Sequence, residues 1–256
     1  MIAIDSYAYN NKLATIHPLE KSLFAILTMI ICLMSETMLT PLLVLALMSG
    51  GIILKAGIPT RLLAKLLAIP LSFLLISVLT IAFSLSTDPS GYWFAHTFTS
   101  ITIGIRYPDL ITAINLFLRS LGAVSCLYFL ALTTPLTELI TLLHKMKVPD
   151  IITELMVLIY RFIFVFLDTA TTIRRAQLSR SGYVSTKSSF RSMSRLFSAL
   201  LGKVFVKSQD LYNAMAARCY TGEIKVLTKK HPVNVKNYFL IVGIEIPLVL
   251  LNLLWR

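Results

Sequence analysis

The sequence predicts an all-α membrane protein with about five transmembrane helices and a pair of long cytoplasmic helices inserted before the last span. Three observations support this prediction. Hydrophobic residues make up 56% of the 256 residues and charged residues only 14%. Apolar runs of roughly the length needed to cross a bilayer recur along the chain. Finally, the segment Arg174–Lys230 holds 12 Lys and Arg residues against only Asp210 and Glu223, a bias typical of the cytoplasmic side.

Five apolar runs are assigned to the bilayer, and they divide the chain into three parts. The runs are Ser22–Leu39, Pro41–Leu54, Leu62–Leu85, Leu110–Thr133 and Tyr238–Trp255. Basic residues flank them at alternate ends, namely Lys12, Lys21, Lys55, Arg61, Lys65, Lys145 and Lys147. We therefore expect four spans in residues 1–133, a cytoplasmic region in residues 134–236 and a last span in residues 237–256, with the N-terminus inside.

A sixth run, Leu155–Leu167, is kept on the cytoplasmic side. It has 13 residues, includes Arg161 and is flanked by Glu154 and Asp168. If it crossed the membrane, the basic segment that follows would lie outside, against the charge rule. We expect it to belong to a helix from about Asp150 to Arg180, which a second helix follows. The second helix carries an apolar stripe at steps of three and four residues, made of Phe190, Met193, Leu196, Phe197, Leu200, Leu201, Val204, Phe205, Leu211, Tyr212 and Met215.

Two arginines at the ends of these helices, each between small residues, are the main candidate site. Arg180 lies between Ser179 and Ser181, and Arg218 lies between Ala217 and Cys219. Small neighbours allow another protein surface to approach the backbone, and a guanidinium binds a carboxylate through two parallel hydrogen bonds. A cation near a helix C-terminus also stabilises the helix dipole. The residues alone therefore leave a docking role and an ordinary helix cap open.

Two charged residues fall well inside predicted spans, away from their ends: Arg119 in the fourth and Glu245 in the last. Charges at such positions face other helices or a polar cavity, so each is either a structural residue or part of a transport path. A pairing between Arg119 and Glu245 is one hypothesis. Pro247 is expected to bend or loosen the last helix.

Several classes of function are disfavoured by what the sequence lacks. The four His and three Cys residues are isolated, so no metal site is expected in this chain. No GxxxxGK[ST] phosphate loop is present, and no cluster of His, Asp or Glu suggests a catalytic site, although a membrane-embedded hydrolase remains an alternative. Nucleic-acid binding is disfavoured because the basic segment lies between membrane spans and carries an apolar stripe. We expect no enzyme activity and no cofactor in this chain.

The pattern of apolar runs and paired arginine motifs resembles the transmembrane T subunit of energy-coupling-factor (ECF) transporters. The stretches "RRAQLSRSGY", "DLYNAMAARCYTGE" and "IDSYAYNNKLATIHPLEK" resemble its cobalt/nickel branch, the CbiQ family, and the resemblance covers nearly the whole chain. It implies a multi-pass protein of a prokaryotic plasma membrane that works with two ABC-type ATPase subunits and a membrane subunit that captures the substrate. ATP and Mg²⁺ would bind to the ATPases.

The resemblance also implies a role for the two arginines. In the family, two Ala-Arg-Gly-like motifs end the coupling helices that rest in grooves of the ATPases, and Arg180 and Arg218 match the motif arginines. This sequence departs from the pattern where Ser181 and Cys219 replace the glycines and where Ser179 replaces an alanine, although small size is kept. The expected function is coupling of ATP hydrolysis to uptake of cobalt or nickel, with a vitamin-type ECF transporter as the alternative.

Overall fold

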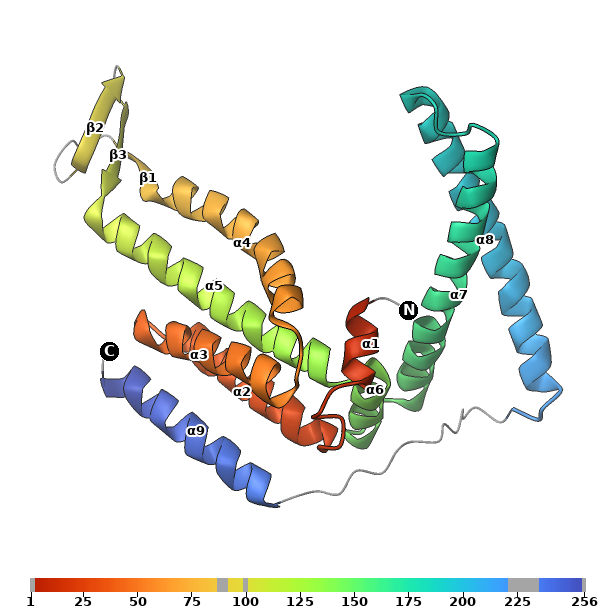
Figure 1. Ribbon diagram of the computed structural model, residues 1–256, viewed down its shortest axis with the longest axis horizontal. Helices are drawn as coiled ribbons and strands as arrows, with labels where there is room; N and C mark the ends of the chain where they lie inside the picture. Colours follow the sequence, from red (N-terminus) through yellow and green to blue (C-terminus); the bar gives the residue numbers. More distant parts are fainter. Residues whose placement is uncertain (1–2, 87–91, 99–100, 221–234, 255–256) are drawn as a thin grey trace. The chain divides into compact units, whose positions relative to one another are not determined.

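The structure is a computed structural model that describes residues 3–86, 92–98, 101–220 and 235–254 (Figure 1). Helices make up most of it, in agreement with the predicted fold class. In chain order they are α1 (Ala3–Tyr9), α2 (Pro18–Met34), α3 (Leu39–Gly50), the π-helical turn η1 (Gly51–Lys55), α4 (Thr60–Ala82), α5 (Tyr107–Thr133), α6 (Leu136–Lys145), α7 (Asp150–Ser179), α8 (Thr186–Ala216) and α9 (Val235–Leu254).

The chain divides into two compact units, which are described separately. One unit, called here the membrane unit, comprises residues 2–136 and 230–256 and contains α1 to α5 and α9. The other, called here the hairpin unit, comprises residues 137–229 and contains α7 and α8. The location of each unit relative to the bilayer stays a prediction.

Helix α5 is the centre of the membrane unit, because α1, α2, α3 and α4 all pack against it. Helix α5 comes close to both α2 and α3 at Gly122. A Cβ atom on this residue would lie 2.6 Å from Cys32 Sγ of α2 and 3.2 Å from the carbonyl oxygen of Pro41 in α3. Cys32 belongs to a cluster of buried apolar side chains from several elements that includes Val44, Met48, Ile52, Phe129 and Leu132. Only a residue without a side chain fits at this crossing.

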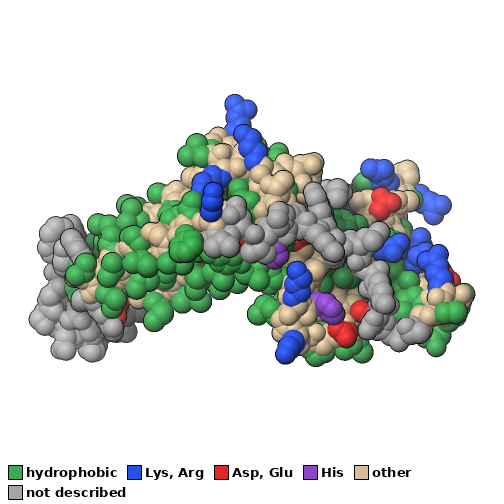
Figure 2. All heavy atoms as spheres, turned by 90° about the horizontal axis from the view of Figure 1, so that it is seen from below, with side chains coloured by type: hydrophobic (Ala, Val, Ile, Leu, Met, Phe, Trp, Pro, Cys, Tyr) green, Lys and Arg blue, Asp and Glu red, His purple; other side chains and the backbone are tan. Residues whose placement is uncertain are grey.

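Three helices of the described chain are long and apolar enough to cross a membrane, over Thr60–Ile81, Pro108–Thr133 and Lys236–Leu254. A shorter apolar helical segment covers Leu39–Lys55, and α2 has 17 residues. The face of this part of the chain seen in Figure 2, on the side of α9, is largely hydrophobic. These features agree with a membrane protein, and the predicted number of five spans stays a prediction.

A small antiparallel sheet, which the sequence analysis did not predict, follows α4. Strands β1 (Phe83–Ser86), β2 (Tyr92–Phe98) and β3 (Ile101–Arg106) are arranged in the order β1-β3-β2. The third apolar run was expected to continue to Leu85, whereas α4 ends at Ala82. Aromatic and β-branched residues are frequent in "YWFAHTF" and "ITIGIR", and such residues favour strands.

Buried polar side chains join the ends of three helices in the membrane unit. The Lys21 ammonium, only 4% exposed, donates hydrogen bonds to the carbonyl oxygens of Leu13 (3.3 Å) and Thr133 (2.9 Å). The Asn11 side-chain amide lies 2.7 Å from the carbonyl oxygen of Ala8 and 3.3 Å from that of Thr133. Because the last carbonyls of a helix lack intrahelical donors, these two side chains provide the C-terminal cap of α5.

The hairpin unit is held by polar contacts at the turn between α7 and α8. The Gly182 carbonyl accepts hydrogen bonds from the hydroxyls of Ser188 (2.9 Å) and Ser192 (2.7 Å), and the Gln177 side chain donates to the carbonyl of Ser192 (2.9 Å). A Cβ on Gly182 would lie 2.8 Å from both the Gln177 carbonyl oxygen and Ser192 Oγ. Gly182 is therefore required for the close approach of the turn to α8.

At the other end of the hairpin, the Tyr220 hydroxyl donates a 2.6 Å hydrogen bond to Glu154 Oε2. This contact joins Tyr220, which lies shortly after the end of α8, to the second turn of α7. The negatively charged acceptor raises the pKa of the Tyr220 phenol, because it stabilises the protonated form. The hairpin is thus fastened by hydrogen bonds near both ends.

Candidate functional site

The end of α7 is a complete Schellman motif in which Arg180 is the last, half-helical residue. The Gly182 amide donates to the Gln177 carbonyl (2.8 Å) and the Ser181 amide donates to the Leu178 carbonyl (3.0 Å), which are the two bonds that define the motif. Ser181 has a φ of 54°, in the left-handed region where glycine is usually found. The chain thus adopts at this position, with serine, a backbone conformation that favours glycine.

The end of α8 repeats this geometry around Arg218. The Tyr220 amide donates to the Met215 carbonyl (3.1 Å) and the Cys219 amide donates to the Ala216 carbonyl (3.1 Å). Cys219 has a φ of 55°. Each arginine therefore precedes a small residue in the left-handed conformation, and the backbone turns in the same way at both motifs.

The Schellman motif alone does not distinguish these two ends from ordinary helix ends. Helix α6 finishes in the same way, with Lys147 at a φ of 64° and the Val148 amide donating to the Leu143 carbonyl (3.2 Å). At the end of α6, the residue before the left-handed position is Met146. Its side chain has no hydrogen-bond donor. What sets the α7 and α8 ends apart is a guanidinium at that position with small residues on both sides.

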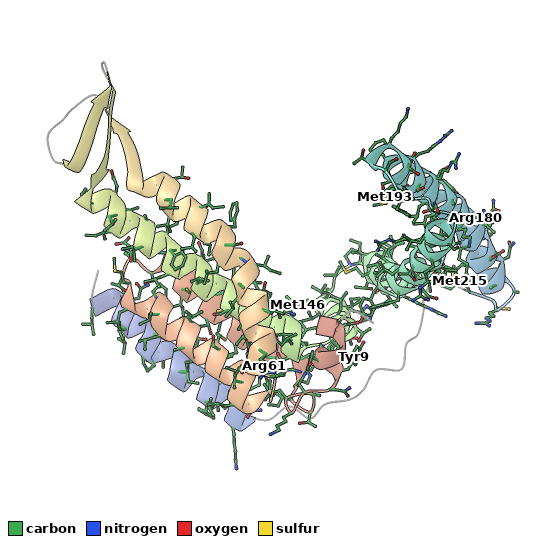
Figure 3. All side chains as sticks on the ribbon, turned by 45° about the horizontal axis from the view of Figure 1, so that its top comes forward. Tyr9, Arg61, Met146, Arg180, Met193 and Met215 are labelled. Atoms are coloured by element: carbon green, nitrogen blue, oxygen red, sulfur yellow. The ribbon has the colours of Figure 1, made fainter. Side chains whose placement is uncertain are left out.

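Both arginines are exposed and available to another molecule. Ser179, Arg180 and Ser181 are exposed at the end of α7, and Ala217, Arg218 and Cys219 at the end of α8. Within the described part of the hairpin unit, no ion pair or side-chain hydrogen bond involves either guanidinium. Side chains cover the outside of both helices, and Arg180 is labelled among them in Figure 3. The structure therefore assigns neither arginine a partner within its own unit.

The two motifs lie far apart because nearly the whole of α8 separates them. Helix α8 has 31 residues, and at a rise of 1.5 Å per residue it is roughly 45 Å long. Arg180 lies before its start and Arg218 follows its end. A single compact groove cannot hold both side chains, so the hairpin offers two separate contact points of the same design.

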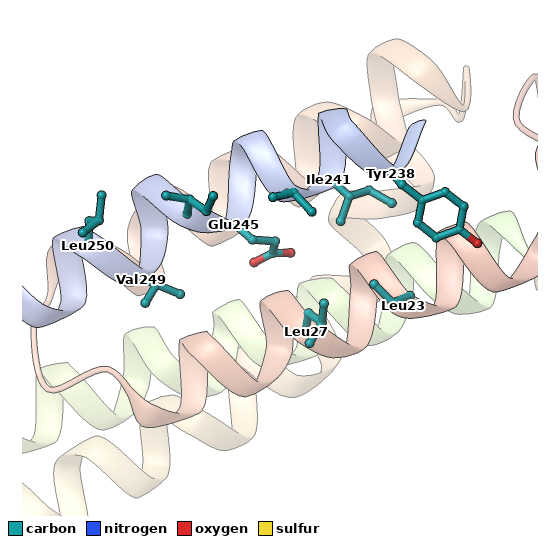
Figure 4. Close-up of a pocket in the computed structure, with 9 residues that line it drawn as sticks. Leu23, Leu27, Tyr238, Ile241, Glu245, Val249 and Leu250 are labelled. Atoms are coloured by element: carbon teal, nitrogen blue, oxygen red, sulfur yellow. The ribbon is translucent and has the colours of Figure 1, made fainter. Parts of the chain in front are cut away.

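The intramembrane candidates Arg119 and Glu245 are not joined by an ion pair in the described residues. Glu245, which is 7% exposed, instead accepts a 2.6 Å hydrogen bond from the Thr28 hydroxyl of α2, and its Oε2 atom is buried without a hydrogen-bond partner. The carboxylate lines a groove of about 300 Å³ between α2 and α9, beside Leu27 and Ile241 (Figure 4). Helix α9 continues through Pro247.

Arg119 also lies among helices, and its Nε atom is buried without a hydrogen-bond partner. Its backbone carbonyl accepts a 3.7 Å contact from Cys32 Sγ. Both ionisable groups are thus directed toward protein, as expected for charged residues at membrane depth, but they meet different neighbours. The hypothesis of an Arg119–Glu245 pair is not supported by this structure.

The sequence analysis missed residues whose importance lies in three-dimensional contacts. Lys21 was read only as a basic residue on the cytoplasmic side, and Asn11 was not singled out, yet both cap α5. The described residues include no group of three or more His, Cys, Asp or Glu side chains arranged to hold a metal ion. The only sequence signal for the α5 cap is the presence of polar residues shortly before an apolar run.

Comparison with known proteins places the chain among cobalt transport proteins. The family model described as "CbiQ: Cobalt transport protein" matches residues 9–229. The cobalt transport protein CbiQ of Salmonella typhimurium is 32% identical over 87% of this chain and 99% of its own length. An uncharacterised protein of Methanocaldococcus jannaschii is 32% identical over 99% of this chain and 93% of its own length.

A third relative differs in its domain organisation. A putative fused cobalt transport protein CbiMQ of Methanocorpusculum labreanum is 32% identical over 86% of this chain but only 36% of its own length. Most of that relative therefore lies outside the region that matches this chain.

Proposed function

Because the chain belongs to the CbiQ cobalt transport protein family, we propose that it is the transmembrane coupling subunit of an ECF-type ABC transporter. In this role it links ATP hydrolysis by two partner ATPases to the uptake of a transition-metal ion, cobalt or nickel. The ion is captured by a separate membrane subunit. The names of the related transport proteins favour a metal over a vitamin as the substrate.

The observation that carries the proposal is the repeated geometry at the ends of α7 and α8. Arg180 and Arg218 each precede a left-handed small residue, are exposed and lie roughly 45 Å apart along the helix. Two identical docking ends at this separation suit a pair of similar partners, one for each end. Two ATPase subunits provide such a pair.

The chemistry of each contact is a charge-assisted hydrogen bond. A guanidinium presents two parallel N–H groups to a carboxylate, and the small side chains beside each arginine let the partner backbone come close. The residues proposed for this contact are Ser179, Arg180 and Ser181 at one end and Ala217, Arg218 and Cys219 at the other. The apolar contacts that fold the membrane unit do not depend on them.

The fused relative supports the proposal that a second membrane component belongs to the assembly. The name of that relative describes a fusion of two cobalt transport components in one chain. The present chain matches 36% of its length. We infer that the present chain likewise works beside a second membrane component, which would be the substrate-capturing subunit.

Substitution of either arginine tests the proposal. Arg180→Ala and Arg218→Ala should each leave the amount of protein in the membrane unchanged, lower the recovery of ATPase subunits on co-purification and abolish ATP-driven metal uptake. Loss of one partner from a buried interfacial charge pair costs about 2 to 5 kcal/mol, whereas loss of a solvated helix cap costs about 0.3 to 1 kcal/mol. The two roles therefore differ in the size of the effect.

Arg175→Ala and Arg191→Ala are matched controls, because both residues are exposed arginines of the same hairpin outside the two motifs. These variants should assemble and transport as the unaltered protein does. If Arg180→Ala and Arg218→Ala recover the ATPases and transport metal at the unaltered rate, the two motifs are helix caps and the coupling proposal is wrong.

A further inference from the structure

The middle of the hairpin unit contains an open groove that the docking motifs do not use. Its volume is about 460 Å³, and it lies between α7 and α8. Helix α7 contributes Val165, Phe166 and Thr169, and α8 contributes Ala199, Gly202, Lys203, Val206 and Lys207. The hydrogen bonds that fasten the two helices lie near the hairpin's ends, so the groove is the region between these contacts.

The groove has an apolar floor and a basic rim. Val165, Phe166 and Val206 line it with hydrocarbon, while Lys203 and Lys207 contribute two ammonium groups. Because these lysines are four residues apart on one helix, they lie on the same face one turn apart. Both are exposed, and neither forms an ion pair or a side-chain hydrogen bond within the described residues. Two adjacent cations beside an apolar surface suit a ligand that has both an anionic head and a hydrocarbon tail.

The surroundings of the groove share this dual character. Along α7 the apolar side chains face outward, with Ile159 at 59%, Ile163 at 43% and Leu167 at 46% exposure. Residues 150–220 carry ten basic side chains against four acidic ones. A helix that combines exposed apolar residues with Lys and Arg is typical of segments that lie in the interface of a membrane, where anionic lipids add electrostatic attraction.

We propose that this groove binds an anionic phospholipid, with the phosphate between Lys203 and Lys207 and an acyl chain against Val165, Phe166 and Val206. The occupant is a lipid of the bilayer in which this protein is embedded. The proposal does not depend on the docking of Arg180 and Arg218, because neither residue lines the groove. The proposal also assigns a function to the Leu155–Leu167 run, which is too short for a span. The C-terminal part of this run, with Val165 and Phe166, would contact acyl chains at the membrane surface.

Gly202 provides a way to close the groove without disturbing the helices. A Cβ at this position would meet no atom within 4 Å, so Gly202→Leu adds a bulky side chain to the groove lining at a position where the backbone has open space beside it. The Lys203→Ala/Lys207→Ala double variant removes the basic rim. Its matched control is Lys187→Ala/Arg191→Ala, which removes the same charge from exposed positions of α8 near the turn.

The test uses the full chain in lipid nanodiscs, with an environment-sensitive fluorophore on a single cysteine introduced as Thr169→Cys after Cys32, Cys126 and Cys219 are replaced by alanine. Brominated phosphatidylglycerol or brominated phosphatidylcholine quenches the fluorophore on contact. We expect severalfold stronger quenching by the brominated phosphatidylglycerol. This preference should be lost in Gly202→Leu and in Lys203→Ala/Lys207→Ala and kept in Lys187→Ala/Arg191→Ala. Normal monodispersity of each variant on size-exclusion chromatography shows that it is folded.

Three results would overturn the proposal. Equal quenching by the two lipids would mean that the segment touches the bilayer without a headgroup site. Absence of quenching by either lipid would mean that the groove faces water or another protein. A preference that survives in Lys203→Ala/Lys207→Ala would place the anionic site elsewhere on the hairpin.

Discussion

The membrane unit has a buried apolar core beneath its exposed apolar surface, whereas the hairpin unit has almost no core. In the membrane unit, apolar side chains from α2, α3, η1 and α5 form a shared core, and Val44, Met48, Ile52 and Leu132 are completely buried. In the hairpin unit, only Leu196 of the α8 apolar stripe is buried, while Phe190 is 81% and Phe205 65% exposed. Apolar residues therefore form both a core and an exposed surface in the membrane unit, whereas in the hairpin unit nearly all of them lie on the surface.

Polar residues show the reverse distribution. The membrane unit buries Lys21, Glu20 and Asn11, and the Asn237 side chain donates a 2.6 Å hydrogen bond to Glu20. In the hairpin unit, Arg180, Arg218 and Lys203 are exposed. A polar group taken out of solvent must be hydrogen-bonded, so Lys21, Glu20 and Asn11 are structural, whereas the exposed Arg180, Arg218 and Lys203 are available for binding. Substitutions should therefore affect stability in the first unit and assembly in the second.

The largest expected loss of stability is at the crossing of α5 with α2 and α3. Gly122→Ala would place a Cβ 2.6 Å from Cys32 Sγ and 3.2 Å from the Pro41 carbonyl oxygen. Overpacking of a close contact costs about 1 to 3 kcal/mol, and the upper end is expected here because one of the two atoms belongs to the backbone. Thermal unfolding of the purified protein in detergent measures the effect.

Gly243→Ala is the matched control for Gly122→Ala, because a Cβ on Gly243 of α9 would meet no atom within 4 Å. It should be neutral or slightly stabilising, since alanine favours a helix over glycine by roughly 1 kcal/mol. Equal melting temperatures for the two variants would show that α5 does not approach α2 and α3 as closely as described.

The next largest effect is expected at the cap of α5. Lys21→Met removes the donor to the Leu13 and Thr133 carbonyls and keeps most of the side-chain volume. A hydrogen bond from a charged donor contributes about 1.5 to 3 kcal/mol, so its loss should lower the melting temperature, although Asn11 still donates to the Thr133 carbonyl. The same replacement at the exposed Lys187 of the hairpin should leave it unchanged, and a similar fall in both variants would refute the contrast between the units.

The parts of the fold that the sequence predicted are those determined by local signals. The sequence predicted a long helix from about Asp150 to Arg180, and α7 begins at Asp150 and ends at Ser179, one residue before the expected end. Apolar runs likewise located α4, α5 and α9. Helix starts, helix stops and hydrophobic periodicity depend on neighbouring residues, so they can be read from a single sequence.

The features that the sequence did not predict depend on residues far apart in the chain. Lys21 and Thr133 are separated by 112 positions and meet only after α2 has packed against α5. Arg119 and Glu245 carry opposite charges, which suggested a pair, but Thr28 provides the partner of Glu245 instead. The left-handed conformation of Ser181 and Cys219 was hidden because neither residue is glycine. Their shared position after an arginine was the only local signal.

The smallest expected effects on stability are at these two left-handed positions of the hairpin unit. Ser181→Gly and Cys219→Gly should each change the free energy of unfolding by less than about 1 kcal/mol. Glycine relieves the strain of a positive φ, but it also increases the entropy of the unfolded chain. Ser181→Val and Cys219→Val should each be destabilising by roughly 1 to 2 kcal/mol, because a β-branched residue is strongly disfavoured at positive φ.

The recovery of ATPase subunits on co-purification then separates a stability effect from a docking effect. If the partners recognise the turn that follows each arginine, the glycine variants should retain the ATPases and the valine variants should lose them even where the membrane level of the protein is unchanged. Lys147→Gly and Lys147→Val supply the control, because Lys147 has the same backbone conformation at the end of α6 without a neighbouring arginine. Equal ATPase recovery with glycine and valine at both Ser181 and Cys219 would show that the partners do not recognise the backbone conformation of these turns.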